Sequence, residues 1–473
     1  MKVSTKSQPY PDFLNFPVID RLREHSPPDA GRLGEILDKA KKLKGLSLED
    51  AAVLLAVQGP DQIQQLMETA RSVKQAIYGN RIVIFAPLYI GNHCVNNCLY
   101  CGFRKDNREL RREKLSQDQI RKQTRHILNQ GHKRIVLLFG EAYDLSYLET
   151  SIETIYAVHE NRSNIRRINV EVAPLDIDGF RRLNQYNIGT YICFQETYDP
   201  KLYQHYHPSG PKSDYAYRLY CMHRAMEGGI DDVGIGALLG LADYKLEVLS
   251  MLQHAKGLES LFGCGPHTVS VPRIEPANGA PLSSRVPQQV SDDAFRIIIA
   301  VLRLTLPYTG IILSTREKAE LRQELFQFGV SQISAGSVTS IGGYTEDNLP
   351  NSSPDTNRDS QFALGDCRPL ETVIRDLIQM EYIPSFCTGC YRRGRVGKDF
   401  MDLAKPGLIK AFCHPNGIMS FAEYLEDYAS PDTRAKGYAL IQKMQAREQS
   451  PKIKSTVDSA IVQIQSGKRD LFI

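Results

Sequence analysis

Short apolar runs alternate with helical segments through the middle of this chain, and this alternation limits its fold more than any other feature. Eight runs have the length and β-branched content of buried strands. They cover residues 82–88, 135–139, 168–172, 190–194, 232–237, 267–274, 310–313 and 332–335. Parallel strands need a helical crossover of this kind between them. Eight such units predict an α/β fold, a (β/α)8 barrel of the TIM type. The other doubly wound sheets are possible but usually have fewer units.

Several of the intervening segments begin with helix N-terminal signals. Ser116 with Gln119, and Ser146 with Glu149, have the spacing of a capping box. Further helices are expected from about residue 178 and over residues 213–227, 245–256, 291–304 and 320–328.

The chain is expected to have three parts. Residues 1–80 read as a helical N-terminal extension that packs on the outside of the barrel, with a capping box at Ser47. Residues 81–345 form the barrel. Residues 346–473 form a smaller, mainly helical C-terminal domain. The polar, turn-rich stretch 345–362 is expected to be a linker or an exposed loop.

Composition excludes several classes of protein. The 473 residues are 42% hydrophobic and 24% charged, which is typical of a soluble globular chain. The net charge of +4 is spread along the sequence and gives no reason to expect nucleic acid as a partner. There is no apolar signal core and no run long enough to span a membrane, so no membrane partner and a cytoplasmic location are expected. Six of the ten cysteines fall in two tight groups, which indicates a reducing compartment.

Three cysteines follow the first predicted strand within eight residues. Cys94, Cys98 and Cys101 have the spacing CxxxCxxC, with the aromatic Tyr100 just before the last. Three thiolates this close can hold three irons of one 4Fe-4S cluster and leave the fourth iron open for another ligand. Zinc sites usually combine a CxxC pair with a second pair or with HxxxH. A zinc knuckle therefore fits this stretch less well than a cluster does.

Polar residues after the second and fourth strands are candidates for binding a small molecule, because all strand ends of a barrel share one mouth. Glu141 can face an ammonium group, and Glu196 can accept hydrogen bonds from hydroxyl groups. Arg218, in a helix after the fourth strand, can pair with a carboxylate through two hydrogen bonds. On the residue pattern alone, Glu196 and Arg218 read better as a surface carboxylate and a surface arginine. A Gly-Glu pair is usually a turn, but Glu141 gains support because it comes one βα unit after the cysteine loop.

Two further strands carry candidates of the same kind. Ser314 and Arg316 follow the seventh strand, where an arginine flanked by hydroxyl groups could receive a substrate carboxylate. Arg273, within the sixth strand run, competes for that role. His267 begins the sixth strand after a proline. A lone histidine is more often a structural residue, so its reading as a metal ligand is only modestly favoured.

A second group of cysteines lies near the C-terminus. Cys387, Cys390 and Cys413 again offer three thiolates, and the basic segment 391–395 between them can offset the negative charge of a second iron–sulfur cluster. The alternative is a zinc site with His414 as the fourth ligand.

Together these motifs carry a specific resemblance. They are the CxxxCxxC loop, the triplet from Phe139 to Glu141, residues 195–200, residues 265–273 and the C-terminal cysteines. Over nearly its whole length the chain resembles the radical S-adenosylmethionine (radical SAM) tyrosine lyases that mature FeFe-hydrogenase. The tyrosine lyases of thiazole synthesis are similar over the barrel but lack the C-terminal cysteines.

The resemblance implies a cluster on Cys94, Cys98 and Cys101 that cleaves S-adenosyl-L-methionine (SAM) to a deoxyadenosyl radical. The SAM contacts carried over from the family are Tyr100, Glu141, Glu196 and Arg218. The radical takes hydrogen from the amino group of L-tyrosine, and the Cα–Cβ bond breaks to give p-cresol and dehydroglycine. Dehydroglycine then yields CO and cyanide at a second 4Fe-4S cluster on Cys387, Cys390 and Cys413.

It also implies further cofactors and partners. An additional iron near the C-terminal cluster, held by His267 and free cysteine, collects the products as an Fe(CO)2(CN) unit. Ser314 and Arg316 match the family's contacts to the tyrosine carboxylate. An electron donor and other hydrogenase maturation proteins are expected partners. A channel through the barrel is expected to join the two clusters, at opposite ends.

Two alternatives stay open on the sequence. One is a tyrosine lyase of the thiazole pathway, which makes p-cresol without CO. The other is an iron–sulfur scaffold protein that carries clusters without radical chemistry.

Overall fold

A closed barrel of eight parallel strands forms the centre of the molecule. The computed structural model describes residues 9–344 and 359–473. Each strand pairs with the next in parallel, and β10 pairs with β1 to close the barrel. The eight predicted strands are therefore confirmed. They are β1 (Arg81–Tyr89), β2 (Arg134–Leu138), β5 (Arg167–Glu171), β6 (Tyr191–Ile192), β7 (Val233–Gly236), β8 (Thr268–Ser270), β9 (Gly310–Leu313) and β10 (Gln332–Ser334).

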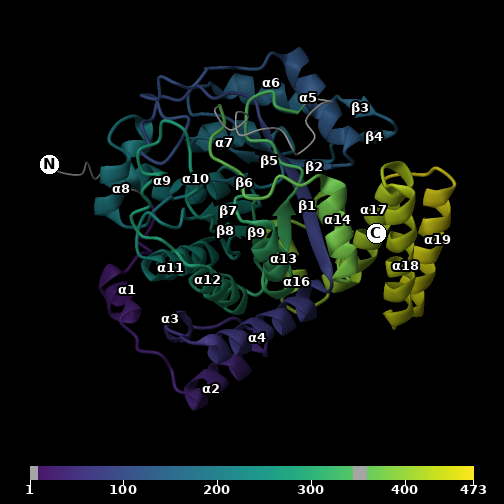
Figure 1. The fold of residues 1–473 in the computed structure, drawn as a ribbon, viewed down its shortest axis with the longest axis horizontal. Helices are drawn as coiled ribbons and strands as arrows, with labels where there is room; N and C mark the ends of the chain where they lie inside the picture. Colours follow the sequence, from purple (N-terminus) through teal and green to yellow (C-terminus); the bar gives the residue numbers. More distant parts are fainter. Residues whose placement is uncertain (1–8, 345–358) are drawn as a thin grey trace.

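Helices cover the outside of the barrel and bury its apolar outer face (Figure 1). The crossover helices are α5 (Gln117–Asn129), α6 (Leu145–Tyr156), α7 (Ile177–Asn184), α8 (Pro200–Tyr206), α9 (Tyr215–Leu219), α10 (Cys221–Glu227), α11 (Tyr244–Phe262), α12 (Asp292–Thr305) and α13 (Ala319–Phe328). The capping box at Ser116 is present as predicted.

Two helix predictions were wrong in detail. Helix α6 is capped by Asp144, whose carboxylate accepts from the backbone N–H of Tyr147, and Ser146 lies inside the first turn. A carboxylate at the cap also suits the positive end of the helix dipole. The single helix expected over residues 213–227 is broken into α9 and α10 because Tyr220 leaves the helical conformation, with φ −90° and ψ 16°. A short 3-10 helix, η1 (Pro211–Ser213), precedes them.

A small hairpin lies outside the barrel and was not predicted. Its strands β3 (His159–Glu160) and β4 (Ser163–Asn164) pair in antiparallel fashion. The turn between them holds Asn161 and Arg162 at positive φ.

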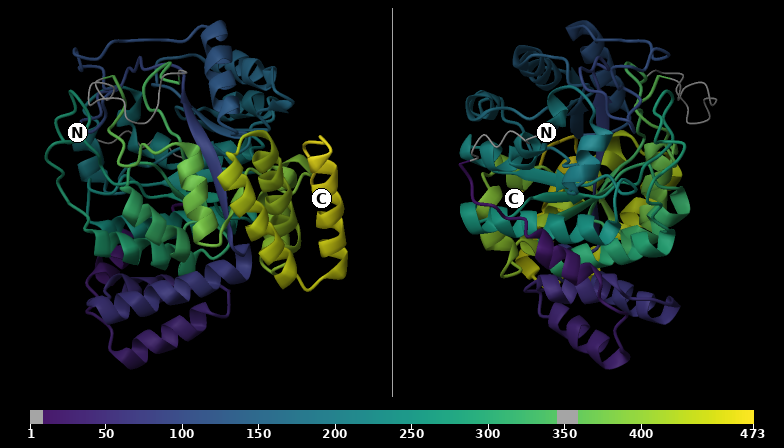
Figure 2. Two further views of the ribbon diagram at one scale, coloured as in Figure 1. Left: turned by 45° about the vertical axis from the view of Figure 1, so that its right-hand side comes forward. Right: turned by 90° about the vertical axis from the view of Figure 1, so that its left-hand side faces the viewer.

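Four N-terminal helices lie outside the barrel, where α1, α3 and α4 pack against the crossover helices α11, α12 and α13, and α2 packs on α3 and α4 (Figures 1 and 2). They are α1 (Phe16–Arg23), α2 (Ala30–Ala40), α3 (Leu48–Leu55) and α4 (Pro60–Tyr78). Ser47 caps α3 with the predicted capping box. This places the N-terminal region on the outside of the barrel.

A short ninth strand brings the C-terminal cysteines to the barrel. Strand β11 (Ile383–Ser385) pairs in parallel with the first half of β1, whereas β2 pairs with its second half. Both lie on the same side of β1, because β10 occupies the other side. The chain leaving β11 therefore meets the start of β2 and must turn beneath the barrel. Cys387 lies at this turn, and its carbonyl oxygen accepts from Arg134 Nη1 at 2.7 Å.

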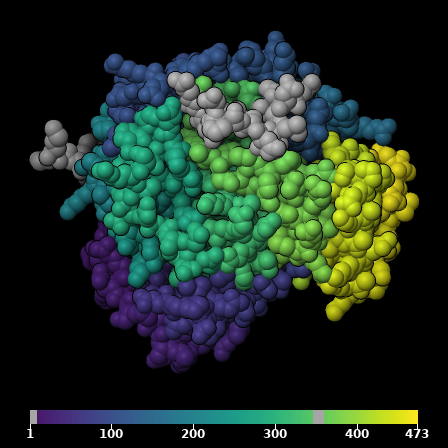
Figure 3. Space-filling model, viewed as in Figure 1, coloured from purple at the N-terminus to yellow at the C-terminus, as the bar shows by residue number. Residues whose placement is uncertain are grey.

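The rest of the C-terminal region is helical, with α14 (Leu370–Gln379), α15 (Gly389–Arg392), α16 (Gly397–Ala404), α17 (Lys410–Asp427), α18 (Pro431–Arg447) and α19 (Pro451–Gln465). Helices α14 and α17 pack against β11, and α18 and α19 pack on α17. Helices α17 to α19, in yellow, form a block at one side of the molecule (Figure 3). The predicted linker at 345–362 and the boundary at residue 346 lie mostly outside the described residues, so the division into three domains stays a prediction. No helix in the described part of the chain is long and apolar enough to cross a membrane.

Candidate active site and second cysteine site

The loop after β1 brings Cys94, Cys98 and Cys101 around one cavity. All three line it, together with Gly140, Glu141, Glu196 and Arg218, and it is called the loop cavity below. Backbone hydrogen bonds hold the loop: the N–H of Leu99 donates to Tyr206 O at 3.1 Å. Close packing adds to this, because a Cβ at Gly140 would lie 2.3 Å from His93 O. The glycine of the predicted Phe139–Glu141 triplet is therefore required by its contact with the cysteine loop.

The three thiols converge on one cavity, an arrangement compatible with three cysteine ligands of one cluster. Among the described residues, no group of three Cys, His, Asp or Glu side chains is arranged to hold one metal ion. The side-chain amide of Gln361 lies 3.8 Å from Cys101 Sγ, and such hydrogen bonds to sulfur tune iron–sulfur clusters.

Glu141 and Arg218 come together at this cavity and pair with each other. Arg218 Nη1 lies 3.1 Å from Glu141 Oε1, and the other Glu141 oxygen accepts from Asn96 Nδ2 at 2.6 Å. Arg218 Nε also donates to Phe194 O at 2.6 Å. Burial raises the pKa of Glu141, but Arg218 and Lys212 outweigh it and hold the pKa below its ordinary value.

Glu196 lies beside this pair in a strained backbone conformation. Its φ is +71°, which is uncommon for a residue with a side chain. A backbone hydrogen bond to the segment after β7 stabilises this conformation: the N–H of Leu238 donates to Glu196 O at 2.8 Å. Such strain is often stored at functional sites, and here it aims a carboxylate into the barrel mouth.

Lys212 was missed by the sequence analysis. Its ammonium group lies 2.6 Å from Glu196 Oε1, and both side chains are buried. A lysine in a loop with Pro, Ser and Asp reads as a solvated residue, so the sequence carried no signal for its burial. Tyr100 packs nearby, since Lys212 Nζ lies 5.8 Å from its ring centroid and His207 Nε2 lies 2.8 Å from its hydroxyl group.

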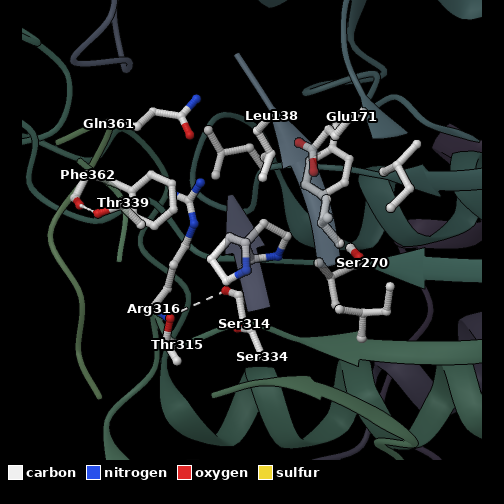
Figure 4. A pocket seen from close by; sticks show the side chains of 18 of the residues that line it. Leu138, Glu171, Ser270, Ser314, Thr315, Arg316, Ser334, Thr339, Gln361 and Phe362 are labelled. Carbon is white, nitrogen blue, oxygen red and sulfur yellow. Dashed lines mark hydrogen bonds between the residues drawn. The ribbon is translucent and has the colours of Figure 1, made fainter. Parts of the chain in front are cut away.

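A second cavity, the central cavity, continues from the loop cavity into the barrel (Figure 4). Ser314 and Arg316 line it as predicted. The Arg316 guanidinium group lies 3.4 Å from the centroid of the Phe362 ring and has no ion-pair partner among the described residues. Apolar side chains make most of the remaining wall, including Phe85, Leu138 and Ile312.

Arg273 is not a candidate for this cavity. Its guanidinium group forms ion pairs with Glu317 and Asp292 and also donates to Val290 O at 2.9 Å. Its charge is thus already matched. Of the two arginines weighed on the sequence, Arg316 is the one that faces the cavity.

The C-terminal cysteines surround a third cavity, the base cavity, at the opposite end of the barrel. Cys387, Cys390 and Cys413 line it with four arginines and His267, the arginines being Arg81, Arg134, Arg167 and Arg395. Four cations suit an anionic cluster and anionic ligands. The thiol of Cys390 donates to Cys413 and, with Arg81 and Arg395 nearby, lowers the pKa of Cys413, although burial opposes this.

His267 is oriented by a carboxylate. Its Nδ1 lies 3.3 Å from Asp232 Oδ1, and Asp232 also accepts from Arg167 at 3.0 Å and from the N–H of Gly397 at 2.9 Å. Burial lowers the pKa of His267 to about 4, which favours the neutral ring. A neutral imidazole with Nδ1 directed at a carboxylate has Nε2 free to bind a metal.

His414 does not fit the zinc alternative. Successive residues of a helix point about 100° apart, and His414 follows Cys413 on α17. Cys413 lines the base cavity but His414 does not.

The two cysteine sets lie at opposite ends of the barrel axis. The central and base cavities share no lining residue. On each of four strands, successive inward positions line different cavities: Val83 and Phe85, Arg134 and Val136, Gly310 and Ile312, Gln332 and Ser334. The two cavities are therefore lined by adjacent layers of side chains along the barrel axis, and a continuous channel stays a prediction.

Comparisons with known proteins agree with this geometry. The radical SAM superfamily model matches residues 88–254, and the model of the biotin and thiamin synthesis associated domain matches residues 270–383. A crystal structure of HydG, a maturase of the FeFe-hydrogenase, is 43% identical, with a TM-score of 0.93, and covers 98% of this chain and 100% of its own. The chain belongs to the HydG family.

Other relatives are consistent with membership of the HydG family. The HydG structure from Carboxydothermus hydrogenoformans is 39% identical, with a TM-score of 0.80, over 94% of this chain and 96% of that one. The 2-iminoacetate synthase of Salmonella typhimurium is 29% identical and covers 72% of this chain and 87% of its own length. The similarity to HydG thus extends further along the chain.

Proposed function

We propose that this protein cleaves the Cα–Cβ bond of L-tyrosine by radical SAM chemistry and then forms CO and cyanide for the maturation of FeFe-hydrogenase. The observation that carries the proposal is the placement of two three-cysteine sets at opposite ends of one barrel. The near full-length similarity to HydG supports the same assignment.

Cys94, Cys98 and Cys101 would hold a 4Fe-4S cluster. When bound and reduced by an electron donor, this cluster together with SAM supplies a carbon radical that takes a hydrogen atom from tyrosine. Glu141 and Arg218 pair with each other in this structure. In this proposal they would exchange that pairing for the ammonium and carboxylate groups of SAM, Glu196 would accept from its ribose, and Tyr100 would contact it.

The central cavity suits tyrosine. Arg316 and Ser314 would receive its carboxylate, because Arg316 is a half-buried cation without an ion-pair partner in the described chain and carboxylates pair well with guanidinium groups. The apolar wall would cover the phenol ring. Exclusion of water by this wall protects a reactive radical.

The base cavity suits the second half of the reaction. Cys387, Cys390 and Cys413 would hold the second cluster, and Nε2 of His267 would bind an additional iron together with free cysteine. The surrounding arginines would attract cyanide and other anions. The expected products are p-cresol from the first site and an Fe(CO)2(CN) unit from the second, which is passed to other maturation proteins.

A product assay tests the proposal. The protein is reconstituted with iron and sulfide under anaerobic conditions, reduced, and given SAM and L-tyrosine. Deoxyadenosine, p-cresol and CO are then measured together, and all three are expected. Deoxyadenosine and p-cresol without CO, from protein with both clusters loaded, would favour the thiazole type of lyase. Absence of all three from loaded protein would favour an iron–sulfur scaffold.

A further inference from the structure

A half-buried carboxyl group, Glu171, stands where the loop cavity meets the central cavity. It is the last residue of β5, and it lines both cavities. The other ionisable side chains shared by the two cavities are already engaged. Lys212 pairs with Glu196, Tyr89 donates to Gln361 at 2.8 Å, and Cys101 accepts from Gln361. Within the described chain, the Glu171 side chain makes no hydrogen bond and no ion pair.

Glu171 faces Arg316 across the barrel. Strand β5 and strand β9, which precedes Arg316, are four places apart in the ring of eight and so lie on opposite sides. Figure 4 shows both side chains extending into the cavity from different sides. One cavity thus presents a cation without a partner and, opposite it, a carboxyl group without a partner. Burying either charge alone is costly, so the pair indicates a ligand that carries both charges.

A free α-amino acid has this charge pattern. With its carboxylate on Arg316, its amino group points toward the opposite wall and toward the junction with the loop cavity. That junction is where a carbon radical formed at the loop cysteines must meet the substrate. We propose that Glu171 binds the α-amino group of the tyrosine substrate and accepts the proton that its ammonium group must lose before a hydrogen atom is taken from nitrogen. This inference rests on the proposed function.

The step is a simple proton transfer. One N–H bond of the ammonium group breaks and one O–H bond forms on Glu171, and no electron moves. The neutral amine then gives a hydrogen atom to the radical. An ammonium group resists loss of a hydrogen atom because the product would carry the positive charge on an electron-poor nitrogen.

The surroundings of Glu171 suit a proton acceptor near neutral pH. Burial, followed by the nearby Glu196, raises its pKa to about 7, while Arg316, Lys212 and Arg218 act in the opposite direction. Tyr89 is the other ionisable group that faces it. A base whose pKa lies near the working pH exchanges protons most effectively.

Binding measurements on unreduced, SAM-loaded protein test the inference without turnover. Glu171→Gln removes the charge and keeps the shape. We expect it to weaken L-tyrosine binding about tenfold or more, the size of a charge-assisted hydrogen bond. Binding of 3-(4-hydroxyphenyl)propionate, which lacks the amino group, is expected to stay within about twofold of wild type. Glu275→Gln is the matched control, since Glu275 lies near Arg316 but does not line the central cavity.

The pH profile gives a second readout. In the wild type, kcat/KM for L-tyrosine, measured by p-cresol formation, is expected to rise with pH through about 7, as Glu171 loses its proton. In the Glu171→Gln variant, this rise of kcat/KM between acid and neutral pH is expected to be absent. Loss of SAM binding with unchanged tyrosine binding would overturn the inference and make Glu171 a SAM contact. Unchanged binding of both ligands would also overturn it. If wild-type protein with both clusters loaded neither binds tyrosine nor forms p-cresol, the proposed function itself fails.

Discussion

The ammonium group of Lys212 lies 2.6 Å from Oε1 of Glu196, inside the mouth of the barrel. Arg218 approaches the same oxygen to 3.7 Å. Burial raises the pKa of Glu196, but the two cations outweigh burial and hold its pKa below the ordinary value. Lys212 therefore keeps a strained, buried carboxylate charged at the position where SAM is expected to bind.

Replacing Lys212 by Met is expected to reduce the free energy of unfolding by ~2 kcal/mol, the size of a hydrogen bond to a charged group. The stability that Glu196 contributes is present above its unfolded pKa and lost as pH falls through its lowered folded pKa. Removing Lys212 raises the folded pKa, so the loss begins at higher pH. Acid unfolding followed by circular dichroism measures this shift. The exposed Lys201→Met is the control, and an unchanged acid transition in Lys212→Met would contradict the account.

Asp232→Asn is expected to weaken the second site and spare the first. The carboxylate lies 3.3 Å from His267 Nδ1, and such partners typically affect metal affinity by about 10- to 100-fold. The readouts are the iron retained beyond the two clusters and the p-cresol formed. We expect the variant to retain less of this additional iron and to form an unchanged amount of p-cresol. The exposed neighbour, Asp231→Asn, should behave as wild type. Equal loss of both readouts in Asp232→Asn would show that its effect is general unfolding.

Phe362→Leu is expected to raise KM for tyrosine and leave SAM binding unchanged. The Phe362 ring lies under the Arg316 guanidinium group at 3.4 Å, and a cation–π contact of this kind contributes about 0.5–2 kcal/mol. This corresponds to about a 2- to 30-fold rise in KM. Phe362→Tyr keeps the ring face and serves as the control. If both variants raise KM equally, the cation–π contact with the Phe362 ring does not position Arg316.

A larger side chain in the layer of the central cavity that adjoins the base cavity is expected to uncouple the two halves of the reaction. Val136 lines the central cavity, one inward position above Arg134 of the base cavity. Val136→Phe should retain p-cresol formation and lower the ratio of CO to p-cresol, because the small product no longer reaches the second site. Val136→Ile is the control. An unchanged ratio in a stably folded Val136→Phe variant would mean that transfer follows another route.

Much of the fold was predictable because buried parallel strands leave a plain signature. Each of the eight barrel strands is a short apolar run between helices. Strand β11 lacked that signature, since Ile383, Pro384 and Ser385 include a proline and a polar residue. Proline is tolerated there because β11 is an edge strand. Its pairing with β1 joins residues 302 positions apart in the sequence, as in Arg81 with Ile383, and no local pattern reports such a contact.

The candidate site was predictable where motifs carry it and not where burial decides it. The cysteines follow a spacing, and Glu141, Glu196, Arg218, Ser314 and Arg316 follow strands. Lys212 and Asp232 acquire their roles from tertiary contacts that the sequence does not display. Arg273 and Arg316 looked equivalent on the sequence, and their ion pairs distinguish them.

In the proposed function, the two cysteine sets do separate work in one chain. Measurement of p-cresol and CO from Cys98→Ser and Cys390→Ser proteins, beside the wild type, tests this division. Cys98→Ser should form neither product and still contain the C-terminal cluster. Cys390→Ser should form p-cresol at close to the wild-type rate and lose CO and the Fe(CO)2(CN) product. If both variants lose p-cresol and CO to the same extent while remaining folded, the division of labour between the two ends of the barrel is wrong.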